Sequence, residues 1–61
     1  MTPDELESAR ALVGMNKAQF CRAIGIVKNS YAQYASGRRE VPLTVALAVA
    51  AVMRGLKPWP E

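Results

Sequence analysis

The 61-residue sequence contains no histidine and only one cysteine, Cys21. A single cysteine cannot form a disulfide within the chain, and without histidine the chain lacks the ligand sets of common zinc modules. The histidine-activated nucleophiles of common hydrolases are excluded for the same reason. We therefore expect no catalytic residues, no metal site, no cofactor and no small-molecule ligand.

The sequence also lacks a hydrophobic run long enough to span a bilayer. The longest apolar stretch, residues 41–53, is shorter than the roughly 20 residues of a transmembrane helix and includes Pro42. The acidic N-terminal segment is unlike the basic start of a signal peptide. These features predict a cytoplasmic protein with no membrane partner, folded as a single domain over residues 1–61.

Negative charge is missing from the middle of the sequence. Asp4, Glu5 and Glu7 lie near the start, and the next acidic residue is Glu40, so residues 8–39 carry six positive charges and no negative one. Such asymmetry favours a polyanionic partner. On charge alone, an ordinary solvated basic surface is an equal alternative.

What the sequence does contain is a set of helix start and stop signals. Thr2 and Glu5 form the pattern of a capping box, and Gly14 is suited to end the helix that they begin. Asn16 is suited to cap a second helix that stops at Gly25. The residues expected to face the core are Leu6, Ala9, Leu12 and Val13 in the first helix, and Phe20, Ala23 and Ile24 in the second.

Two further helices are expected in the second half of the chain. One runs from about Lys28 to Ser36 and ends at Gly37, and the other begins at Pro42 and ends near Gly55. No segment has the alternating pattern of a strand. The predicted fold class is therefore all-α, with four helices in a compact arrangement, or five if a short C-terminal turn forms.

The third of these helices has two different faces. At helical spacing Tyr31, Tyr34 and Ala35 face inward. Lysine can donate to guanine, asparagine and glutamine can bond adenine through two atoms, and an alanine methyl suits the thymine methyl. The outward face has these residue types and follows a glycine turn among cations, which favours base contacts in the major groove over a plain solvent face. The candidate base-contacting residues are Lys28, Asn29, Ala32 and Gln33.

Residues on either side of this helix suit contacts with the DNA backbone. The start of the second helix offers free amides, a positive dipole end and a cationic side chain, which together can hold a phosphate. Helix capping and solubility are the alternative roles, and Arg22 is a weaker candidate. The candidate phosphate-contacting residues are Asn16, Lys17, Ser36, Arg38 and Arg39.

The fourth helix is apolar almost all round, which is more than one core-facing stripe requires. We expect a second copy to cover the surplus, so that two recognition helices lie about 34 Å apart on a palindromic site. The alternative is that alanine-rich positions are tolerated at the surface and the tail covers the rest. The candidate residues of the homodimer interface are Val49, Val52, Met53, Leu56 and Trp59.

In order and spacing, these features resemble those of the phage repressor and Cro-like helix-turn-helix domains, often called the XRE family. The resemblance covers roughly residues 6–53 and rests on Gly14 to Lys17, on Phe20 with Ala23 to Ile26, and on Tyr34 to Pro42. It implies a lambda-repressor-like fold, with the helix-turn-helix unit at about residues 17–36, and a double-stranded DNA operator as partner. It also implies that the position of Lys17 contacts a phosphate or a base edge, and that those of Lys28, Asn29 and Gln33 read bases.

Three positions depart from the family pattern. Val27 stands where many relatives have a Ser or Thr that caps the recognition helix, so Ser30 or a DNA phosphate would have to compensate. Lys17 stands where relatives commonly have Gln, which keeps a phosphate contact but not the amide geometry.

The third departure concerns Arg10. In relatives an arginine at this position commonly pairs with a glutamate, but Ala35 occupies the place of that glutamate here. Arg10 can pair with Glu7, pair with Glu40 or turn to the DNA, and the sequence leaves these alternatives open.

We predict a sequence-specific DNA-binding transcriptional regulator, most simply a repressor that occupies an operator as a dimer in a bacterial or phage-infected cell. The alternative is a protein–protein interaction module, such as an antitoxin or inhibitor, acting through the apolar fourth helix and the C-terminal tail. RNA is less favoured as a partner because no strand platform presents aromatic side chains to bases.

Overall fold

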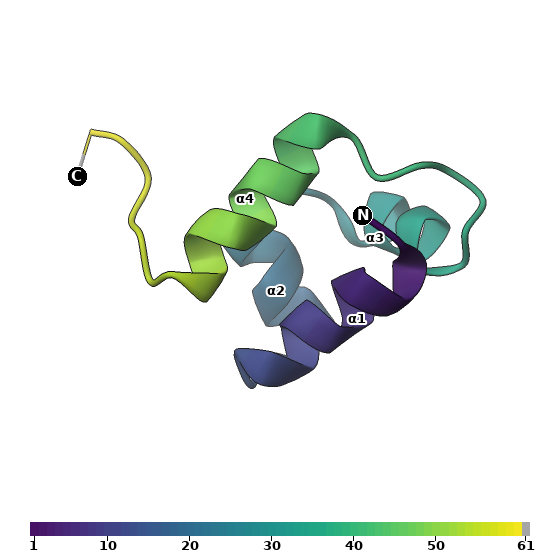
Figure 1. Cartoon of the computed structure of the whole chain (residues 1–61), viewed down its shortest axis with the longest axis horizontal. Coiled ribbons are helices and arrows are strands. Elements are labelled where there is room, and N and C mark those ends of the chain that lie inside the picture. The colour runs from purple at the N-terminus through teal and green to yellow at the C-terminus, as the bar shows by residue number, and fades with distance from the viewer. Residues whose placement is uncertain (61) are drawn as a thin grey trace.

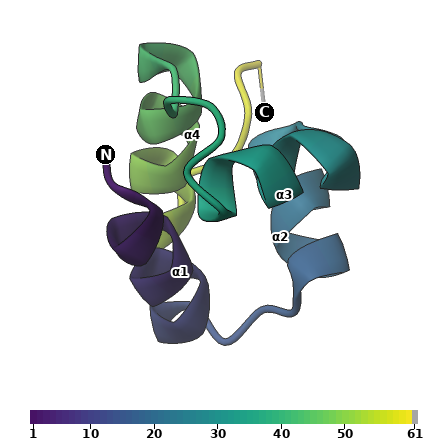
Figure 2. The same ribbon diagram turned by 90° about the vertical axis from the view of Figure 1, so that its right-hand side faces the viewer.

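The computed structural model describes residues 1–60, and over that range the chain forms four helices and no strand (Figure 1). Helix α1 contacts α3 and α4, and α2 contacts the same two helices, so the four close around one core (Figure 2). This arrangement confirms the predicted all-α fold class. No fifth helix forms in residues 54–60, which leave the end of α4 as an extended tail (Figure 1). The helices are α1 (Pro3–Leu12), α2 (Lys17–Ile24), α3 (Lys28–Ala35) and α4 (Leu43–Met53).

Reciprocal capping boxes begin the first two helices, which confirms the predicted capping box of Thr2 with Glu5 and the predicted cap Asn16. In α1 the Glu5 amide donates to the Thr2 hydroxyl at 3.1 Å, and the Thr2 amide donates to the Glu5 carboxylate at 2.7 Å. In α2 the Gln19 amide donates to Asn16 Oδ1 at 2.8 Å, and the Asn16 amide donates to Gln19 Oε1 at 3.0 Å. Each box satisfies two backbone donors that a helix start otherwise leaves open.

Helix α3 begins without such help. Its N-cap residue is Val27, and no side chain makes a capping hydrogen bond there. Of the two alternatives for compensation, Ser30 is therefore wrong, and the DNA phosphate stays a prediction. The first-turn amides of α3 have no side-chain acceptor among the described residues.

The turn between α2 and α3 depends on Gly25, whose φ of +76° lies in the left-handed region. Its amide donates to the carbonyl of Cys21, which also accepts from the amide of Ile26 at 3.0 Å. No atom lies within 4 Å of the position that a Cβ would take at residue 25. The backbone conformation, and not crowding, is what favours glycine here.

Each helix contributes one fully buried large side chain to the centre of the core: Leu6, Phe20, Tyr31 and Val49. The rings of Phe20 and Tyr31 meet edge to face, with centroids 6.1 Å apart and planes at 87°. This contact joins α2 to α3 and so fixes the two helices of the turn against each other. The other buried residues are Ala9, Cys21, Ile24, Tyr34 and Val45.

Three inward or outward assignments made from the sequence are wrong. Leu12 is 76% exposed, because the buried stripe of α1 continues from Leu6 and Ala9 towards Val13. Ala23 is exposed, and Cys21 takes the inward place on α2. The third error is Val49, which was assigned to a subunit interface.

Val49 is 0% exposed and lies in the core of its own chain. Its side chain has no surface left for a second copy to contact.

Among residues 1–60, no helix combines the length and the apolar character needed to cross a membrane.

Candidate nucleic-acid interface

Helix α3 turns its polar side away from the core. Tyr31 and Tyr34 are buried on the inner side, as predicted. On the outer side, the start and middle of the helix are accessible to solvent, whereas Arg39 lies against Gln33 near its end. Of the candidate base-contacting residues there, Lys28, Asn29 and Ala32 are exposed and Gln33 is half-buried.

Two neighbouring hollows collect most of the candidate residues along this side of α3. The larger, of about 480 Å³, is bordered by Lys17 from α2 and by Lys28, Ala32 and Ser36, together with Cys21, Tyr31 and Ala35. The smaller, of about 280 Å³, is lined by Asn29, Ala32, Gln33, Ser36 and Arg38. The base-contacting candidates therefore lie beside Lys17, which precedes α3, and beside Ser36 and Arg38, which follow it.

Asn16 and Ser36 are both used in helix capping. The Oδ1 atom of Asn16 accepts the Gln19 amide, which leaves its side-chain amino group as a donor. The Ser36 hydroxyl donates to the carbonyl of Gln33 at 3.2 Å. These bonds confirm the capping role that was the alternative for each residue. They hold Asn16 at the start of α2 and Ser36 at the end of α3.

The two arginines after α3 differ in their surroundings. Arg38 is exposed and makes no side-chain hydrogen bond or ion pair within residues 1–60. Arg39 donates from Nη1 to Gln33 Oε1 at 3.0 Å, and its guanidinium carbon lies 5.3 Å from the centroid of the Tyr34 ring. The sequence predicts the same phosphate role for both, whereas only Arg38 extends into solvent without such contacts.

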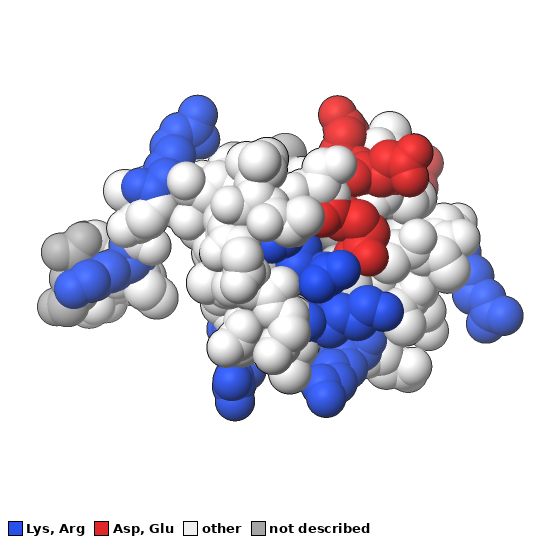
Figure 3. Space-filling model, turned by 90° about the horizontal axis from the view of Figure 1, so that it is seen from below, with Lys and Arg blue, Asp and Glu red and all other residues white. Residues whose placement is uncertain are grey.

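The charged side chains are unevenly distributed over the surface. Figure 3 shows several Lys and Arg side chains close together on one face, with the Asp and Glu side chains gathered towards one edge of it. This separation follows from the sequence, in which the acidic residues precede residue 8 or follow residue 39. A cluster of positive side chains attracts a polyanion and repels basic proteins.

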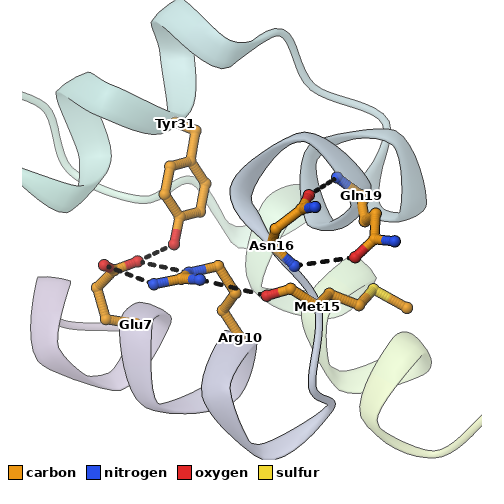
Figure 4. A network of polar contacts seen from close by, with 6 residues as sticks. All are labelled: Glu7, Arg10, Met15, Asn16, Gln19 and Tyr31. Carbon is orange, nitrogen blue, oxygen red and sulfur yellow. Dashed lines mark hydrogen bonds and ion pairs between the residues drawn. The ribbon is translucent and has the colours of Figure 1, made fainter.

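A polar network behind α3 answers the question of what Arg10 contacts (Figure 4). Arg10 pairs with Glu7, with Nε and Oε2 3.3 Å apart, and donates from Nη1 to the carbonyl of Met15 at 3.2 Å. The Tyr31 hydroxyl donates to the same Glu7 carboxylate. The network thus links α1, α3 and the loop that leads into α2.

Tyr31 and Glu7 each keep the protonation state that the hydrogen bond between them requires. The Tyr31 hydroxyl, with help from Arg10, lowers the pKa of the Glu7 carboxyl below 4.5. Burial, reinforced by the bond to Glu7, raises the pKa of Tyr31 to about 12. Around neutral pH the carboxylate is charged and the phenol keeps its proton, so the bond persists.

The cysteine and the acidic side chains of the described residues do not support a reactive-thiol site or a metal site. Burial raises the pKa of the Cys21 thiol, which keeps it in its less nucleophilic form. In the part of the chain that the structure describes, no three cysteine or acidic side chains are grouped closely enough to hold a metal ion.

Comparison with protein families gives a match over most of the chain. A family model described as helix-turn-helix matches residues 6–57, which include the whole of α2, α3 and α4 and most of α1. No curated protein and no solved structure matches the chain significantly.

Proposed function

Because the chain belongs to the Cro-like (XRE) helix-turn-helix family of DNA-binding regulators, we propose that it is a repressor that binds a palindromic operator as a dimer. The observation that supports this most directly is the exposure of Lys28, Asn29 and Ala32 on the outer side of α3. Repression then requires only that the bound protein block RNA polymerase. No catalytic step is part of the proposal, and the partner places the protein in the cytoplasm with the DNA.

In this proposal α3 enters the major groove and reads bases through its outer residues. Lys28 donates to guanine, Asn29 and Gln33 bond adenine, and the Ala32 methyl contacts a thymine methyl. Each good two-atom contact discriminates against a wrong base by about 1–3 kcal/mol. The buried faces of Tyr31 and Tyr34 hold the helix at a fixed rotation, so that the same residues meet the groove each time.

Phosphate contacts hold the domain on the duplex from both sides of α3. The amides at the start of α2, with Asn16 and Lys17, would bind one phosphate, and Ser36 and Arg38 would bind another across the groove. The uncapped first turn of α3 offers further amides. With about four contacts in each of two subunits, log Kd should change with log salt concentration with a slope of about 7.

The proposed dimer would cover apolar side chains at the end of α4 and in the tail. Val49 is buried and is no longer a candidate for the interface. Four of the predicted interface residues remain: Met53, Leu56 and Trp59, which are exposed, and Val52, which is half-buried. Leu43 and Leu47, one turn apart on α4, are 74% and 61% exposed and were missed as candidates in the sequence. A monomer gains nothing from exposing leucines at this spacing, which supports a second copy as their cover.

The test of function begins with selection of duplexes from a random DNA pool. A palindromic consensus is expected, and the Lys28→Ala/Gln33→Ala double variant should lose preference for it while its helix content and oligomeric state stay unchanged. Arg54→Ala is the matched control, because it removes one positive charge from an exposed position far along the chain from α3. The absence of any consensus for the unmodified chain would refute the proposal.

A second candidate function rests on the tail. Trp59 is 92% exposed, which is unusual for the largest apolar side chain of a small domain. If the Lys28→Ala/Gln33→Ala variant keeps full activity in cells and Trp59→Ala abolishes it, a protein-binding role as antitoxin or inhibitor replaces the repressor.

A further inference from the structure

Arg39 makes more contacts with its own chain than an arginine that only binds a phosphate would need. Its guanidinium lies over the Tyr34 ring at 5.3 Å and donates to the side chain of Gln33 at 3.0 Å. Gln33 is one of the residues proposed to read bases. Arg39 therefore contacts a base-reading side chain and not only the surface around it.

The backbone brings Arg39 to this position independently of its side chain. Gly37, with a φ of +81°, reverses the chain just after α3, and its amide donates to the carbonyl of Tyr34 at 3.2 Å. The Arg39 amide then donates to the carbonyl of Gln33 at 3.3 Å. Residue 39 is thus held beside the last turn of α3 before any side-chain contact forms.

The chemistry of the contact determines how the Gln33 amide is oriented. A guanidinium has only donors, so the Gln33 atom that faces it must be the oxygen Oε1. The amino group of Gln33 then lies at the other end of the amide plane, and within residues 1–60 it makes no hydrogen bond. Oε1 retains a second lone pair, so it can accept from a base as well as from Arg39.

We propose that Arg39 is a positioning residue for base recognition, which holds the Gln33 amide in the single orientation that bonds adenine. In that orientation Oε1 accepts from adenine N6 while the amino group donates to N7. Guanine presents an acceptor, O6, in place of the N6 donor, and the held oxygen repels it. This inference rests on the proposed function and assigns to Arg39 a role in specificity in place of the phosphate contact expected from the sequence.

The test uses the consensus duplex selected from a random pool and its single-base-pair variants. The base pair at which Gln33→Ala loses its preference identifies the contact, and we expect adenine there. Arg39→Lys keeps the charge but not the planar donor fork, and should reduce the preference for adenine at that pair about fivefold to tenfold. Affinity for unrelated duplexes and the salt dependence should stay as in the unmodified chain.

Two comparisons separate this role from a phosphate contact. Arg38→Ala is the matched control: it should weaken binding to every duplex alike and lower the salt slope by about 1. In a chain that already carries Gln33→Ala, Arg39→Lys should cause no further loss of preference, because the side chain that it positions is gone.

The possible contrary results are distinct. Unchanged base preference in Arg39→Lys, with a uniform loss of affinity and a reduced salt slope in Arg39→Ala, would return Arg39 to the phosphate role. A consensus with guanine at the Gln33-dependent pair would overturn the inference and leave the proposed function intact. A chain that selects no consensus would overturn both.

Discussion

The Tyr31→Phe substitution removes a single oxygen atom from the fold, the one that donates to the Glu7 carboxylate. The ring itself is 2% exposed and packs edge to face against Phe20, and phenylalanine keeps both properties. The loss of stability in this variant therefore measures the hydrogen bond alone.

The expected loss follows from the kind of bond and its exposure. A hydrogen bond to a charged group contributes about 1.5–3 kcal/mol, and water lowers this figure here because the Glu7 side chain is 39% exposed. We expect a decrease of about 1–2 kcal/mol in the free energy of unfolding. For a domain of this size, the melting temperature then falls by about 5–15 °C.

The difference between the two proteins should also depend on pH. Because the pKa of Glu7 is lowered in the folded chain, the carboxylate contributes its full stabilisation at pH values above its ordinary pKa of 4.5. This contribution is lost as the pH falls below 4.5 and through the lowered pKa. Urea unfolding followed by circular dichroism should give a clear deficit for Tyr31→Phe at pH 7 and a much smaller one near pH 3.

The control is Tyr34→Phe, since the Tyr34 hydroxyl makes no hydrogen bond within residues 1–60 and the side chain is also buried. A Tyr31→Phe variant within about 0.5 kcal/mol of the unmodified chain at pH 7 would refute the reasoning, because that is the scatter of neutral substitutions. An equal deficit at both pH values would show that Glu7 is not the partner that matters.

Three other changes test the local structure. Val27→Ser supplies the missing N-cap of α3 and should raise the free energy of unfolding by about 0.5–1 kcal/mol, measured by urea titration. Gly25→Ala should lower it by about 1–2 kcal/mol through backbone strain alone, and an equally stable variant would show that the turn tolerates a side chain. Because the pKa of Tyr31 is raised from 10.0 to about 12, its contribution to stability is complete below pH 10 and is lost as the pH rises towards 12. Thermal melts across that range should show the loss, and Tyr31→Phe should remove this part of the alkaline dependence.

Local signals made the helix ends predictable. Thr2 with Glu5, and Asn16 with Gln19, satisfy backbone donors within four residues of the chain, so their roles follow from the sequence alone. The inward face of α2 was harder, because eight residues give only about two turns in which to establish a stripe. Cys21 is equally compatible with either side until the neighbouring helices are placed.

Helix α4 could not be divided into faces from its sequence. A helix that is apolar all round has no periodic contrast, and so nothing separated the buried Val49 from the exposed Leu43 and Leu47. The packing of α1 and α2 against it makes that division.

In the candidate site, the outer side of α3 was predictable because four polar or small residues share one helical face. The bonds behind and beside it were not. Tyr31 and Glu7 are 24 residues apart in the sequence, and nothing short of the fold brings them together. Likewise, the two arginines after α3 differ only because the turn at Gly37 directs residue 39 back onto Gln33.

The shared carboxylate of Glu7 has a consequence for how related chains can diverge. A relative that has alanine at 35, as here, and loses the acid at position 7 leaves the phenol of residue 31 without an acceptor and the cation of residue 10 without its counterion. Two further changes are needed to repair both defects, one at residue 31 and one at residue 10, so substitutions at the three positions should be inherited as a set. In an alignment of homologues, phenylalanine at 31 should accompany the absence of the acid at 7.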